Sequence, residues 1–151
     1  MTYIYELFIS DKVCFEQVAR VLSDYANISS EKIGTMDECI DKFETEDEIK
    51  VAMDIYYYLE GYKTYVDINY IDFEFKESQI TELACKLAVE LKSNVALADD
   101  VDCGEFNYII ISPDRKYQKA YEMYSNTETL NFTTHSDKAD ISEYLSIVDK
   151  E

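Results

Sequence analysis

The clearest pattern in the chain is an alternation of apolar and polar positions that begins after Ile49. Apolar or aromatic residues take every second position: Val51, Met53, Ile55, Tyr57 and Leu59. Beyond Glu60-Gly61 the alternation resumes, with Tyr65, Asp67 and Asn69 set against Val66, Ile68 and Tyr70. A period of two predicts strands, and Gly61 can supply the positive φ of a short turn, so we expect a β-hairpin. One face of this hairpin is aliphatic, and the other mixes Asp, Asn and Tyr.

Apolar residues spaced three and four positions apart predict three helices. The first is expected from Ser10, a candidate N-cap, to about Tyr25. The second follows Phe75, with Ser78 as a possible cap. The third begins near Ser136 and places four apolar residues on one face: Ile141, Tyr144, Leu145 and Val148.

Short β-branched and aromatic runs predict further strands. They are residues 3–10, 94–98, 106–112 and 116–124, and the turn Ser112-Pro113-Asp114-Arg115 joins the last two. Residues 27–48 have a weaker pattern and end in a dense acidic run, so we expect a connection there with a strand around residues 31–34.

The order of these elements indicates the α+β class. It begins as strand, helix, strand, strand, helix, strand, which is the ferredoxin-like βαββαβ order. We expect an antiparallel or mixed sheet with helices on one face, extended by an extra hairpin and a C-terminal helix. With 151 residues and 47% hydrophobic composition, the chain is expected to form a single domain over residues 1–151.

Charge narrows the range of partners. The chain has 32 acidic and 14 basic residues, a formal net charge of -18, and both halves share the excess. An acidic surface repels nucleic-acid phosphates and anionic lipid, and it attracts basic proteins. We therefore expect a basic protein partner, with no nucleic acid and no membrane.

The cysteines and the N-terminus favour a reducing compartment. Cys14, Cys39, Cys85 and Cys103 lack the paired spacing of zinc sites, so we expect free thiols, with Cys14 and Cys85 buried. The first residues lack a basic segment followed by an apolar one, and no apolar run is long enough for a membrane helix. We expect a cytoplasmic protein.

Motifs for catalysis and metal binding are missing from the sequence. His135 is the only histidine, and no nucleophile motif accompanies it. The loop from Asp99 to Glu105 is rich in carboxylates, but a calcium-loop alignment on Gly104 puts Val101, Cys103 and Ile110 at ligand positions. We therefore expect no enzyme activity, no cofactor and no metal.

Two acidic regions are the candidate partner site. The first is the mixed face of the hairpin, with Asp54, Tyr56, Tyr58 and Asp67, and the second is the loop with Asp99, Asp100, Asp102 and Glu105. Carboxylates beside tyrosines can bind Lys and Arg through charge-assisted hydrogen bonds and cation–π contacts. The alternative for the tyrosines is half-buried packing against the last helix or the acidic connection. That connection ranks second as a partner site, with these carboxylates: Asp37, Glu38, Asp41, Glu44, Glu46, Asp47 and Glu48.

The chain resembles the immunity proteins of bacterial toxin–immunity pairs, including those of contact-dependent growth inhibition. The resemblance is carried by its small acidic α+β character, by Leu97-Ala-Asp-Asp100 and by the run from Asn107 to Arg115. It implies a cytoplasmic inhibitor that covers the cationic active site of a cognate toxin, with nuclease-type domains as the expected targets, and it transfers no individual site residues. Two alternatives stay open: a ferredoxin-like ligand-binding regulatory domain or enzyme, and a nucleic-acid mimic.

Overall fold

A nine-stranded sheet forms the centre of the fold, and four helices pack against it. The computed structural model describes residues 5–102, 104, 106–123 and 125–148. The sheet is mixed but largely antiparallel, because among its described strand pairs only β2 and β3 run parallel. The α+β class expected from the sequence is confirmed.

The sheet contains both predicted hairpins. Its strands are β1 (Tyr5–Ile9), β2 (Ile33–Gly34), β3 (Val51–Tyr57), β5 (Thr64–Ile71), β6 (Val95–Ala98), β7 (Asn107–Ile111), β8 (Lys116–Glu122), β10 (Phe132–Thr134) and β11 (Ala139–Asp140). Their order is β10-β8-β7-β6-β1-β5-β3-β2, and β11 also pairs with β8. Two short strands, β4 (Glu60–Gly61) and β9 (Thr129–Leu130), form a separate parallel pair. The ferredoxin-like order is not evident from the strand order of the complete sheet.

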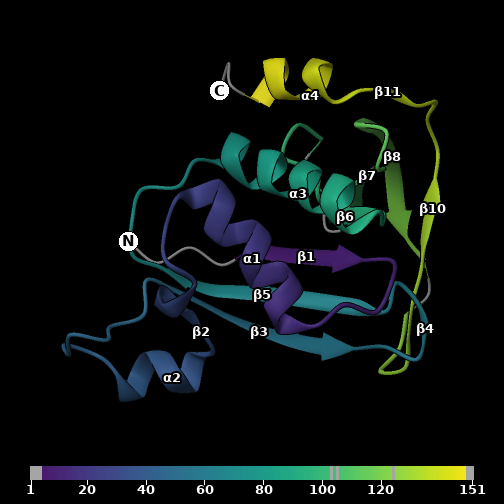
Figure 1. Ribbon diagram of the computed structural model, residues 1–151. Coiled ribbons are helices and arrows are strands. Elements are labelled where there is room, and N and C mark those ends of the chain that lie inside the picture. The colour runs from purple at the N-terminus through teal and green to yellow at the C-terminus, as the bar shows by residue number, and fades with distance from the viewer. Residues whose placement is uncertain (1–4, 103, 105, 124, 149–151) are drawn as a thin grey trace.

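Three helices form a layer on one face of the sheet (Figure 1). They are α1 (Phe15–Ala26), α3 (Glu77–Leu91) and α4 (Ile141–Val148), while α2 (Met36–Asp41) and a 3-10 turn (Ser30–Lys32) lie in the connection after α1. The layer buries one alternating set of strand residues, which we call the main core: Leu7, Ile9, Met53, Val66, Ile68, Leu97 and Ile109 belong to it. The aliphatic face of the hairpin is therefore the core face. No helix in the described ranges has the length and apolar character needed to cross a bilayer.

The second face of the sheet carries the residues that alternate with the main core. Residues 125–131, which we call the strap, cover one part of it, because Leu130 is buried there with Phe8, Ala96, Ile110 and Ala120. The Tyr62 amide donates to the Leu130 carbonyl at 2.7 Å, which ties the strap to the β3–β5 turn. At the other end of the face, α2 packs through Cys39 against Ile49 and Ala52.

The start of α1 differs from the sequence expectation. The helix begins after Cys14, whereas the Ser10 hydroxyl lies 2.7 Å from that of Ser93 and accepts the Asn94 amide. Ser10 therefore joins the end of β1 to the segment before β6 and does not cap a helix. Cys14 is exposed at the N-cap, so its predicted burial is wrong, while Cys85 is buried as expected.

The later helices also start at other residues than expected. α3 begins at Glu77 with Lys76 as its N-cap, so Ser78 lies inside the helix. α4 begins at Ile141 because the chain before it first pairs with β8 through β10 and β11. The acidic connection contains the short helix α2, which the sequence pattern did not predict.

Candidate functional site

Three carboxylates lie directly opposite one another on three adjacent strands of the second face. Asp67 on β5 pairs in register with Asp54 on β3 and with Glu6 on β1. We call Asp54, Asp67 and Glu6 the acidic row. Each alternates with main-core residues on its own strand, so all three side chains point away from the helix layer.

The carboxylates of the acidic row repel one another. Burial raises the pKa of Asp67 above its ordinary value, and the charges of Glu6 and Asp54 raise it further. Tyr65 donates its hydroxyl to Glu6 at 2.7 Å, and the Asn69 amide donates to Asp54 at 3.0 Å. The six ion pairs of the described residues all involve other carboxylates. The acidic row thus has polar hydrogen-bond partners and no ion-pair partner within the described chain.

Aromatic rings flank the acidic row along the strands. Tyr56 is 52% exposed, and its ring centroid lies 5.6 Å from that of Tyr65, which stacks on Phe8 at 5.0 Å. Tyr58 is half-buried and packs at the border of the Leu130 cluster. Because Tyr56 is exposed and not half-buried, the packing alternative does not describe this residue. Tyr58 packs against the Leu130 cluster instead.

A fourth carboxylate on the second face belongs to Glu122 of β8. Burial raises its pKa, and the Glu6 charge raises it further. The same two carboxylates act on Tyr108, where burial is the main cause that raises the pKa to about 12. Carboxylates on this face are therefore found from β3, with Asp54, to β8, with Glu122.

Asp99 in the predicted partner loop is buried inside the protein. Only 4% of the residue is exposed, and its Oδ1 accepts the amides of Val101 and Asp102 at 3.0 and 3.1 Å. The Tyr144 hydroxyl of α4 also donates to Oδ1 at 3.0 Å and accepts the Asp100 amide at 2.9 Å. Because Tyr144 and Lys119 satisfy the charge of Asp99 within the protein, Asp99 is not part of the contact surface proposed below.

The rest of the loop does not join the acidic row. Asp102 is exposed and forms an ion pair with Lys119, which also lies 3.8 Å from Asp99. Lys119 alternates with Ala120 of the second face, so it extends toward the helix side of the sheet. Asp100 is bound through its amide to Tyr144, and Glu105 lies outside the described residues. The two predicted acidic regions thus face different sides of the molecule.

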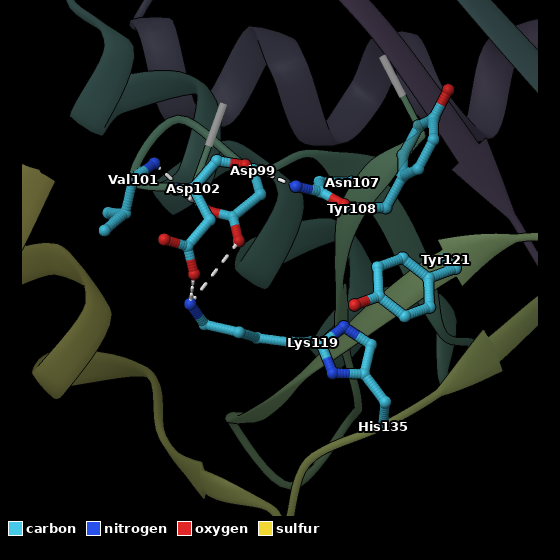
Figure 2. A pocket seen from close by; sticks show the side chains of 8 residues that line it. All are labelled: Asp99, Val101, Asp102, Asn107, Tyr108, Lys119, Tyr121 and His135. Atoms are coloured by element: carbon cyan, nitrogen blue, oxygen red, sulfur yellow. Dashed lines mark hydrogen bonds and ion pairs between the residues drawn. The ribbon is translucent and has the colours of Figure 1, made fainter. Parts of the chain in front are cut away.

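A pocket of about 470 Å³ lies beside this loop. Figure 2 shows the group of Asp99, Asp102 and Lys119 on one side and the stacked rings of Tyr121 and His135 on the other, with centroids 4.0 Å apart. His135 is exposed, and its amide donates to the Lys119 carbonyl at 2.9 Å. The pocket combines a cation, carboxylates and an imidazole, the kinds of group that can hold a small polar ligand.

Sequence reasoning missed Glu6 and Glu122 as members of the acidic face. Glu6 is the only charged residue in the predicted first strand, and that isolated charge among apolar residues was an available signal. Its position opposite Asp67 depends on strand register, which no local pattern reveals.

Metal coordination gains no support from the arrangement of the described residues. None of the described His, Cys, Asp and Glu residues form a group of three or more that could hold a metal ion.

Comparisons with protein-family models, with curated proteins and with solved structures found no match to this chain. Functional inference therefore depends on the acidic face and on the pocket.

Proposed function

We propose that this protein is an acidic inhibitor that binds a basic protein through the second face of its sheet. The observation that carries the proposal is the acidic row, in which Asp54, Asp67 and Glu6 stand directly opposite one another and form no ion pair with a described Lys, Arg or His. Like charges directly opposite in a sheet are destabilising. A partner that supplies Lys or Arg relieves this repulsion and gains charge-assisted hydrogen bonds.

Exposed tyrosine beside the acidic row supports a cationic occupant. Tyr57, on the other side of the same strand, already holds the Lys12 ammonium 5.0 Å from its ring centroid. Tyr56 presents a comparable ring on the second face, 52% exposed and next to Asp54. A Lys or Arg of the partner can bind the ring and the carboxylates together.

We further propose that the partner is a toxin with a nuclease-type cationic active site, and that inhibition takes place in the cytoplasm. The resemblance to immunity proteins supports this role, and so does the net charge of -18.

For the fold, we propose that part of the sheet forms a ferredoxin-like unit, built from β6-β1-β5-β3 with α1 and α3. These four strands are neighbours in that order, and the two helices pack side by side.

Co-expression with the protein encoded by the neighbouring reading frame tests the proposal. Wild type is expected to restore growth when that protein is toxic, and the double variant Asp54→Asn, Asp67→Asn is expected to lose protection. The control is Asp24→Asn, Glu31→Gln, which removes two exposed charges elsewhere. An equal loss of protection by both variants would show that net charge, and not the acidic row, governs binding, whereas full protection by the row variant would exclude the row as the binding site. Failure of wild type to bind a basic protein would overturn the proposal.

The pocket favours a second candidate function, a ligand-binding regulatory domain or enzyme. Its lining brings His135, Lys119 and Asn107 together with carboxylates. Thermal unfolding in the presence of small polar metabolites tests this role. A stabilisation that His135→Ala and Asn107→Ala remove would favour the ligand-binding function over the inhibitor.

A further inference from the structure

A second surface of the molecule combines exposed apolar residues with dense negative charge. It consists of residues 35–48, which we call the acidic projection, and it contains α2. Figure 1 shows α2 beyond the edge of the sheet, away from the layer of α1, α3 and α4. Thr35 caps the helix by accepting the Glu38 amide at 3.2 Å. The acidic run in the sequence is therefore an ordered element.

The projection is held in place from one side only. Cys39 is buried against Ile49 and Ala52, and Met36 packs at the border of this cluster. Lys32 adds a contact by donating its ammonium to the Glu46 carbonyl at 3.0 Å. These contacts hold α2 through one of its sides and leave other side chains of the projection exposed.

Two large apolar side chains of the projection remain exposed. Ile40 is 62% exposed and Phe43 is 59% exposed. They lie three positions apart where the chain leaves α2: Ile40 is in the last turn of the helix, Phe43 follows the C-cap Lys42, and the Phe43 amide donates to the Ile40 carbonyl. Aromatic and aliphatic residues exposed side by side are typical of contact sites on protein surfaces.

The negative charge around Ile40 and Phe43 restricts the kind of partner that can bind over them. From residue 35 to 48 there are seven acidic residues and one lysine, a net charge of -6 within the total of -18. Lys42 is already engaged, 3.9 Å from Glu38. A second copy of the chain or an anionic membrane would bring more negative charge against the projection. A basic protein surface is complementary to it.

We infer that the acidic projection inserts Ile40 and Phe43 into an apolar pocket rimmed by Lys and Arg on the basic partner. This inference rests on the proposed function, because it requires the same partner. The two surfaces are neighbours: Ala52, against which α2 packs, stands two positions before Asp54 on the same strand. A single partner can therefore contact the projection and the acidic row together.

Truncation of the apolar pair tests the inference, with the basic protein from the neighbouring reading frame as the probe. The double variant Ile40→Ala, Phe43→Ala is expected to weaken binding at least tenfold, because buried anchors dominate interface energies. Its circular dichroism and thermal unfolding should match wild type, since both side chains are exposed in the free protein. The matched control is Val89→Ala, Ile147→Ala, which truncates exposed apolar residues on α3 and α4 and is expected to bind normally.

The outcomes separate this inference from the proposed function. If the projection variant binds as tightly as wild type while Asp54→Asn, Asp67→Asn fails, the inference is wrong and the acidic row remains. If wild type itself does not bind, both fail. Sedimentation of the free protein gives a further check: a dimer that Ile40→Ala, Phe43→Ala abolishes would assign the surface to self-association and overturn the inference.

Discussion

Asp67 is in an electrostatically unfavourable position in the free protein, and it is also a proposed contact of the basic partner. It stands between Asp54 and Glu6, and its pKa is raised first by burial and further by the charges of these two neighbours. A residue kept in an unfavourable environment within the free protein is often one that a binding partner stabilises. The acidic row thus predicts opposite effects of mutation on folding and on binding.

Asp67→Asn is expected to stabilise the free protein at neutral pH and to weaken partner binding. Removing one charge from the middle of the row relieves two repulsive contacts, so the free energy of unfolding should rise by about 0.5 kcal/mol. Urea unfolding measures this change. A loss of stability would mean that polar contacts of Asp67 outweigh the repulsion.

The same residue predicts a difference in pH dependence between wild type and Asp67→Asn. The raised pKa means that the folded state binds this proton more tightly than the unfolded state. The contribution of Asp67 to stability therefore increases as the pH falls through its folded pKa toward the ordinary 3.8. The stability advantage of Asp67→Asn should shrink over that pH range, as urea unfolding at a series of pH values would measure. A constant difference across that range would contradict the assigned pKa shift.

Tyr144→Phe is expected to destabilise the protein by about 1–2 kcal/mol. The variant removes a buried hydroxyl that donates to Asp99 and accepts the Asp100 amide. Thermal unfolding provides the measurement, and Tyr56→Phe serves as the control because its hydroxyl belongs to an exposed side chain. Equal stability of the two variants would argue against a structural role for the Asp99 contacts.

At the scale of elements, the β3–β5 hairpin depends on Gly61. Its φ is +80°, and an added Cβ would lie 2.0 Å from the Leu130 carbonyl oxygen of the strap. Gly61→Ala is therefore expected to cost about 2 kcal/mol or more in the free energy of unfolding. Gly34→Ala is the control, since its Cβ would meet side-chain atoms at 3.1 and 3.3 Å. A smaller loss at Gly61 than at Gly34 would contradict the close β4–β9 contact.

Periodic patterns predicted the elements that pack on the main core. The alternation after Ile49 is strong because Met53 and Val66 face a helix layer while Asp54 and Asp67 face outward. The sequence pattern of α2 is weaker because only one of its faces is buried, against a small cluster around Cys39. The strap has almost no local signal, since the buried position of Leu130 depends on strands far away in the sequence.

The candidate site was predictable only where it lies within one hairpin. Alternation placed Asp54, Tyr56 and Asp67 on one face without knowledge of the fold. The position of Glu6 required the register of β1 against β5. The burial of Asp99 required Tyr144 and Lys119, which reach it from other parts of the chain.

At the scale of the whole molecule, the net charge of -18 predicts a response to salt. Self-repulsion destabilises a compact, highly charged chain, and screening reduces it. Raising the salt concentration to about 0.1 M, where the Debye length is about 10 Å, should raise the unfolding temperature. The association rate with a basic partner should fall several-fold over the same range, while the dissociation rate changes less. Stopped-flow mixing measures both rates, and salt-independent association would contradict electrostatic attraction.

The strap also affects the order in which the structure can form and open. Its strand β9 pairs with β4, and the two segments are far apart in the sequence, so this contact closes a long loop. The β3–β5 hairpin and the main core can form before that closure. Native-state hydrogen exchange should therefore find the Tyr62 amide, bonded to Leu130, opening at a lower free energy than the amides of β5. Local opening there would uncover the aromatic cluster around Phe8 while the helix layer stays folded.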